Sequence, residues 1–259
     1  MGHTIVGELP KTKRWDQVLA LLQAPEVDPA AVAGATVDAA ERRLLALRGD
    51  PSVTYCFWIL TRLASAARGE DFQAASAALG IDVRHDEHAL SLIAKVNERA
   101  RDELEHYPES GPFGELASLS LRSALTRALG AQNLPLFQSS VDDLVGVFRR
   151  HSSASQFGEL ATSFFGDFYA QTLRYYIDRA IPGSMHADGG LRSLSDGEDF
   201  RAALDLHARE SARIVETFAA SWFTKHRGTH GETISRDEAE GFTAHALRKL
   251  RKELQVDAT

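Results

Sequence analysis

The chain has 259 residues, of which 44% are hydrophobic and 25% are charged, with a net charge of −7 and a single cysteine. This composition is typical of a globular protein and excludes a disordered chain, which would have fewer apolar residues, and a disulfide scaffold, which needs several cysteines. The negative charge argues against a protein whose main role is to coat nucleic acid or an anionic membrane, because both need a positive field.

Apolar residues recur at helical spacing from the start of the chain onward. A short helix is expected after Thr12, because one face of it would carry Trp15, Val18, Leu19 and Leu22. Asp28 and Pro29 then combine an N-cap residue with a proline that fits the first helical turn. The same pair recurs at Asp50 and Pro51. These signals predict helices that begin at 29 and at 51.

The helix that begins at Pro51 is apolar on nearly every side. Six consecutive apolar residues extend from Tyr55 to Leu60, which is the pattern of a buried helix. Cys56 lies inside this run, where burial would raise the pKa of the thiol and disfavour the reactive thiolate. We therefore interpret Cys56 as a small core residue.

The clearest interruption of the helical pattern is the segment 106–112, HYPESGP, which contains two prolines and a glycine. Seven residues are an ordinary length for a connection between two helices. We therefore predict a single α-helical domain over 1–259. The segment 106–112 is the one candidate sub-boundary within it, between an N-terminal helical part, 1–106, and a C-terminal helical part, 112–259.

A predicted helix at 155–180 is the expected centre of the fold, because it holds about a third of the aromatic residues. Its polar residues fall on one stripe, which consists of Glu159, Ser163, Asp167, Gln171, Arg174 and Asp178. The stripe could form an acidic groove or a contact face for a partner. We favour the simpler interpretation, a solvated stripe on a core helix.

The pentapeptide FGELA occurs twice, at 113–117 and at 157–161, each time at the start of a predicted helix. An internal duplication would dock these two helices equivalently around a pseudo-symmetric core. No longer period supports a duplication, and we favour coincidence.

The last two predicted helices, at 197–225 and 236–254, each begin with a capping-box pattern, Ser195 with Glu198 and Ser235 with Glu238. We therefore predict an all-α fold of about ten helices, arranged as a single orthogonal helical array or an irregular bundle. The remaining predicted helices lie at 29–49, from Pro51 onward, and at 70–80, 86–106, 113–129 and 140–150.

Motifs of familiar catalytic sites are missing from the sequence. It contains no P-loop, no dinucleotide-binding glycine pattern, no nucleophile elbow and no H-E-x-x-H helix. Glu103 and His106 have the E-x-x-H spacing of di-iron bundles, but such a site needs a second copy. The sequence thus favours a protein without catalytic activity and without a cofactor.

One alternative function rests on the polar segment between the last two predicted helices. His226, His230 and Glu232 could together hold a divalent metal with open coordination positions. The alternative is a metal-dependent hydrolase that uses these three residues. A polar surface loop is the interpretation we favour.

A second alternative rests on the basic cluster of the last helix, Arg248, Lys249, Arg251 and Lys252, which could contact nucleic acid or an acidic partner. However, the same helix begins with acidic residues, and acidic starts and basic ends are what the helix dipole favours without any ligand. The cluster also lacks interleaved aromatic residues that would stack on bases.

The features together favour a non-catalytic helical interaction or assembly subunit of a bacterial cytoplasmic multiprotein complex. The N-terminal sequence has no signal-peptide core, and arginine outnumbers lysine, as is typical of GC-rich bacterial genomes. The expected partners are other protein subunits, with self-association as a further option. A membrane partner is not expected, and nucleic acid is not expected as the main partner.

Overall fold

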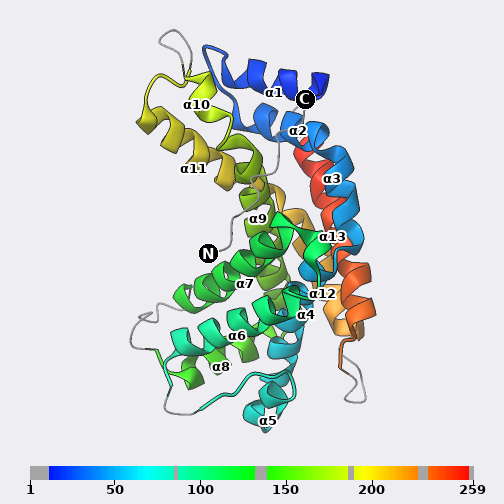
Figure 1. The fold of residues 1–259 in the computed structure, drawn as a ribbon. Coiled ribbons are helices and arrows are strands. Elements are labelled where there is room, and N and C mark those ends of the chain that lie inside the picture. The colour runs from blue at the N-terminus through cyan, green and yellow to red at the C-terminus, as the bar shows by residue number, and fades with distance from the viewer. Residues whose placement is uncertain (1–11, 85–86, 132–138, 186–189, 227–232, 257–259) are drawn as a thin grey trace.

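Helices make up nearly all of the structure, a computed structural model that describes residues 12–84, 87–131, 139–185, 190–226 and 233–256 (Figure 1). The first half contains α1 (Lys13–Leu22), α2 (Pro29–Ala39), α3 (Glu41–Ala46), α4 (Pro51–Ala66), α5 (Phe72–Ala77) and α6 (Ala89–Leu104). The second half contains α7 (Pro112–Gly130), α8 (Val141–His151), α9 (Ala154–Ile177), α10 (Ile181–Ser184), α11 (Leu194–Ser211), α12 (Arg213–His226) and α13 (Arg236–Val256). The all-α prediction is confirmed, because the described residues contain no strand.

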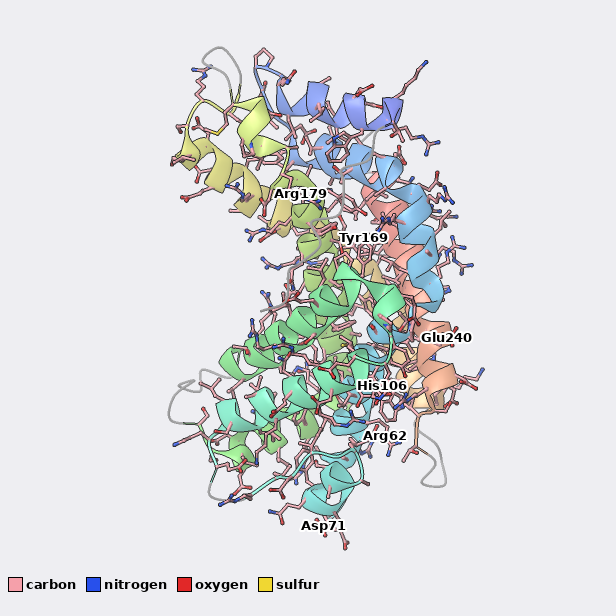
Figure 2. The ribbon with its side chains drawn as sticks, in the orientation of Figure 1. Arg62, Asp71, His106, Tyr169, Arg179 and Glu240 are labelled. Carbon is pink, nitrogen blue, oxygen red and sulfur yellow. The ribbon has the colours of Figure 1, made fainter. Side chains whose placement is uncertain are left out.

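Helix α9 runs through the centre of the molecule. Helices α1, α2, α10 and α11 gather at one end of it and α5, α6 and α8 at the other (Figure 1). Its main packing partners are α7, α11 and α12. Tyr169 on α9 lies in the interior, and its hydroxyl donates to the Leu247 carbonyl oxygen of α13 at 3.0 Å (Figure 2). Among the described residues, no helix has both the length and the apolarity to cross a membrane.

Phe57 of α4 is the centre of the aromatic core. It is fully buried, and its ring stacks on Phe242 of α13 with 4.9 Å between the centroids. It also contacts rings from α9 and α12, namely Phe157, Phe164, Phe165 and Trp222. Cys56 beside it is fully buried, and burial raises the pKa of its thiol, as the sequence predicted.

Predicted helix starts are confirmed where a side chain caps the backbone. Asp28 accepts a hydrogen bond from the Ala30 N–H at 2.9 Å. Asp50 accepts from the N–H groups of Ser52 and Val53 at 3.0 Å each. Ser235 and Glu238 form the reciprocal bonds of a capping box at the start of α13.

The capping box predicted at Ser195 and Glu198 is wrong. The N-cap residue lies two positions earlier, at Ser193, and its capping-box partner is Asp196. The Ser193 N–H donates to Asp196 Oδ2 at 2.8 Å, and the Asp196 N–H donates to Ser193 Oγ at 3.1 Å. Ser193 and Ser195 are each followed by an acidic residue three positions later, so the local pattern that indicated Ser195 fits Ser193 equally well.

The single helix predicted at 197–225 is interrupted at Ala212, between α11 and α12. Two glycines of α9 lie where these helices pack against it. A Cβ at Gly166 would lie 3.1 Å from Ala212 Cβ, and one at Gly158 would lie 3.1 Å from Glu216 Cγ. The interruption therefore lies at a point where the chain packs closely against α9.

The two copies of FGELA have the same packing role in different places. Phe113 and Phe157 are both buried. The glycine that follows each phenylalanine faces a neighbouring helix, because a Cβ at Gly114 would lie 3.3 Å from Ser52 Oγ of α4 and Gly158 faces α12. The partner helices differ.

The segment 106–112 packs against the N-terminal part of the chain. It contains a 3₁₀ turn, Pro108–Ser110, and Ser110 in this turn is buried. The Ser110 hydroxyl donates to Asp50 Oδ1 at 3.1 Å and accepts from the Ser52 hydroxyl at 2.8 Å. This contact joins the turn to the start of α4. The assignment of one domain to 1–259 stays a prediction.

Candidate functional site

The predicted metal ligands are only partly within the described residues. His230 and Glu232 lie outside them. His226 is the last residue of α12, where its Nδ1 lies 2.8 Å from the Trp222 carbonyl oxygen and its ring stacks on the Trp222 ring. Among the described residues, no three His, Cys, Asp or Glu side chains are grouped so that they could hold a metal ion.

Glu103, which has the E-x-x-H spacing with His106, serves in an ion pair. Its carboxylate accepts from Arg236 at 2.7 Å, from Arg99 at 2.9 Å and from the Tyr107 hydroxyl at 3.0 Å. Burial alone would raise the pKa of Glu103, but these hydrogen bonds lower it. The contact joins α6 to the first residue of α13.

The four residues of the predicted basic cluster do not share one surface. Arg251 points inward, with a side chain that is 13% exposed, and its Nη1 lies 3.0 Å from Glu41 Oε1 of α3. Arg248, Lys249 and Lys252 are exposed on α13. Three of the four cations are therefore available to a partner, and the fourth holds α13 against α3.

Helices α12 and α13 pack side by side (Figure 1). A groove lies between them. Its volume is about 540 Å³. We call it the α12–α13 groove, and its lining consists of Phe218, Ser221, Trp222, Lys225, His226, Glu238, Gly241, Phe242 and His245. It brings one predicted metal ligand, His226, next to residues that the sequence analysis did not single out.

The floor of the groove is aromatic. The Phe242 ring is 4.5 Å from the Trp222 ring and 5.4 Å from the Phe218 ring, measured between centroids. Phe242 is buried, whereas Phe218 and Trp222 are only partly buried and lie one turn apart on α12. Ile214, one turn before Phe218, is partly buried as well. The described structure thus leaves an apolar stripe of α12 partly open to solvent.

Two cations of α13, Arg248 and Lys249, lie beside the groove, next to its lining residue His245. Arg248 Nη2 lies 2.9 Å from His245 Nδ1. Burial lowers the pKa of His245, and the charges of Arg248 and Lys249 lower it further. His245 is therefore neutral at pH 7. Because an arginine can only donate, Nδ1 accepts this bond and the imidazole proton resides on Nε2.

The one carboxylate in the lining, that of Glu238, is already engaged. It accepts from the Ser235 N–H at 2.8 Å and from the Ser235 hydroxyl at 2.9 Å. The backbone bond lowers the pKa of Glu238, so the group stays ionised as a helix cap. Lys225 at the other rim is exposed. The groove thus combines an apolar floor with the exposed Lys225 at one rim, Arg248 and Lys249 beside the other, and one ionised carboxylate, that of Glu238.

The polar stripe of α9 forms a second candidate site. Three ion pairs join it to α11: Asp167 with Arg209 at 2.8 Å, Arg174 with Asp205 at 2.8 Å, and Asp178 with Arg201 at 2.6 Å. We call these three pairs the ion-pair ladder. The interpretation of this stripe as solvated is wrong at Asp167, whose side chain is only 2% exposed.

Asp167 is the most connected residue of the ladder. Its Oδ1 accepts from Arg127 Nη2 and Arg209 Nε at 2.8 Å each. Its Oδ2 accepts from the Ser123 hydroxyl at 2.7 Å and from Arg127 Nη2 at 3.0 Å. Arg127 and Ser123 belong to α7, so this one carboxylate joins α7, α9 and α11. A buried carboxylate needs such partners, because burial without them would cost several kcal/mol.

Comparison with known proteins adds no relative, because no protein-family model, no curated protein and no solved structure matches this chain.

Proposed function

We propose that this protein is a non-catalytic interaction subunit of a bacterial cytoplasmic multiprotein complex, and that the α12–α13 groove binds an acidic amphipathic segment of another protein. The observation that carries the proposal is the combination of a partly open aromatic stripe with a cationic rim. Partly exposed apolar surfaces of this kind are typical of interaction sites.

The apolar stripe on α12 is arranged as a receptor for helical side chains. Ile214, Phe218 and Trp222 are four residues apart on one face of α12, and the last two of them line the groove. Grooves of this kind bind the apolar face of an amphipathic helix, whose anchors repeat at i, i+3 or i+4 and i+7. The volume of about 540 Å³ lies within the range of about 300–1,000 Å³ of known binding pockets.

The charge of the rim selects the kind of partner. Lys225 lines the groove and Arg248 and Lys249 lie beside it, so three cations stand against the one carboxylate of the lining, that of Glu238, which accepts hydrogen bonds from Ser235. A segment with aspartate or glutamate next to its apolar anchors would place opposite charges at the rim, which steers association and disfavours basic segments.

Gly241 provides the test. It lines the groove, and a Cβ built there would meet no atom within 4 Å. A tryptophan at this position would therefore enter the groove without disturbing the packing of α13. Gly241→Trp should block the groove, and Gly241→Ala, which adds only one methyl group, is the matched control.

The experiment selects short peptides that bind the full chain from a display library that contains acidic, neutral and basic amphipathic sequences in equal shares. We expect wild type and Gly241→Ala to enrich acidic peptides with aromatic or leucine anchors three or four residues apart. We expect Gly241→Trp to enrich none of them. Enrichment of basic peptides, or equal enrichment by Gly241→Trp, would overturn the proposal.

A further inference from the structure

We propose that Arg127 of α7 and two arginines of the ion-pair ladder, Arg174 and Arg209, form a binding site for a phosphate group. This site is separate from the α12–α13 groove and does not depend on the function proposed for it. It lies on α9, at Asp167 and Arg174, between the sides of α9 that face α7 and α11.

Buried carboxylates hold the three arginines in place before any ligand binds. Arg127 and Arg209 donate to the same oxygen of Asp167, so their donor nitrogens lie within about 6 Å of each other. Asp205, whose side chain is 13% exposed, holds Arg174 at 2.8 Å and lies 3.9 Å from Arg209 Nη2. A site held in this way loses little conformational entropy when a ligand binds.

The three arginines retain guanidinium N–H groups that can donate to a ligand. Each guanidinium group has five N–H bonds. The side chains of Arg127, Arg174 and Arg209 are 47%, 41% and 39% exposed, so each side chain reaches solvent in part. Within the described part of the chain, Arg127 donates only through Nη2, which leaves its Nε and Nη1 groups available.

The arginines of this cluster outnumber its carboxylates. Three arginines face two carboxylates in this cluster, because Asp167 is shared by Arg127 and Arg209 while Asp205 serves mainly Arg174. One positive charge is left over. Arginine forks match the oxygen atoms of a phosphate in pairs, so a phosphate group would meet both the unmatched charge and the free donors.

Two sources could supply the phosphate group: inorganic phosphate or a nucleotide. The experiment measures the affinity of the full chain for sodium phosphate and for ADP by isothermal titration calorimetry, with sodium chloride holding the ionic strength constant. Binding of phosphate alone identifies the free ion, and tighter binding of ADP identifies a nucleotide. Failure of both ligands to bind would overturn the proposal.

Two variants separate binding from the stability of the ladder. Arg127→Gln removes a donor of the proposed site, and we expect it to weaken binding by about tenfold or more, the usual effect of losing a charge-assisted hydrogen bond. Arg201→Gln breaks the third pair of the ladder, with Asp178, and leaves the three proposed arginines intact. We expect it to bind as wild type does. Equal affinity of the two variants would overturn the proposal.

Arg127→Lys keeps the charge but loses the planar fork. It takes the place of Arg127→Gln in the binding experiment if that variant does not fold. We expect it to bind phosphate several-fold more weakly than wild type, because a lysine cannot donate in pairs to two phosphate oxygens. Wild-type affinity in Arg127→Lys would contradict the proposed fork geometry.

Discussion

Arg127 of α7 and Arg209 of α11 donate to the same atom, Oδ1 of Asp167 on α9, at 2.8 Å each. The three residues are 40 and 42 positions apart in the chain. One carboxylate therefore fixes how three helices sit against each other. The Asp167 side chain is only 2% exposed. Removal of its carboxylate would leave both arginines without their shared partner.

We predict that Asp167→Asn lowers the free energy of unfolding by about 1–3 kcal/mol, because it removes the charge-assisted hydrogen bonds of a buried carboxylate while its arginine partners stay partly in water. Urea unfolding, followed by circular dichroism, measures this loss of unfolding free energy. Asp178→Asn is the control, because Asp178 is 45% exposed and pairs with one arginine, so it should cost less than about 1 kcal/mol. Similar losses in both variants would show that burial of Asp167 has no energetic consequence.

We predict that Phe57→Ala lowers the free energy of unfolding by about 3–5 kcal/mol, because it opens a cavity between five other aromatic rings. The exposed Leu206 of α11 provides a comparison, and its replacement by alanine should change stability by no more than about 0.5 kcal/mol. Thermal unfolding of the two variants tests the position of the core. A small effect at Phe57 would be inconsistent with an aromatic centre.

The pKa of Glu103 is below its ordinary value, so its contribution to stability has a defined pH dependence. A carboxylate with a lowered pKa contributes stability above its unfolded pKa of about 4.3, and this contribution disappears as the pH falls through the folded value. We therefore predict that wild type loses more stability than Glu103→Gln between about pH 5 and pH 3. Unfolding curves of both proteins across this range measure the difference. An equal loss of unfolding free energy with falling pH in wild type and in Glu103→Gln would contradict the prediction.

Gly241 is inside α13 and exposed, with no neighbouring atom within 4 Å of a Cβ. An alanine there avoids the entropic cost of a helical glycine, so we predict that Gly241→Ala raises the free energy of unfolding by about 0.5–1 kcal/mol. Chemical denaturation measures the gain. A loss of stability would mean that the space beside Gly241 is occupied, and the groove would then be closed.

Much of the fold follows from local sequence signals. Asp28, Asp50 and Ser235 cap helices where an N-cap residue precedes a proline or pairs with a glutamate three positions later, and these signals depend only on adjacent residues. The interruption at Ala212 could not be predicted, because no glycine or proline marks it. It coincides with the close approach of Ala212 to Gly166 of α9, a contact between residues far apart in the chain.

Both candidate sites depend on such long-range contacts. Charged residues four apart on α11, Arg201, Asp205 and Arg209, were visible in the sequence, but their partners on α9 were not known to lie beside them. Arg251 belonged to a basic run, yet Glu41, 210 positions away, holds it inward. The partly open stripe of Phe218 and Trp222 has the same spacing as a core face, and only burial distinguishes the two.

The central claim is that the α12–α13 groove binds an acidic amphipathic segment, and its most direct test is the affinity of one selected acidic peptide for three proteins. Calorimetric titration should give similar Kd values for wild type and Gly241→Ala and a Kd at least about tenfold higher for Gly241→Trp, because the indole fills the space of the anchor. Equal Kd values for Gly241→Trp and Gly241→Ala would contradict the account.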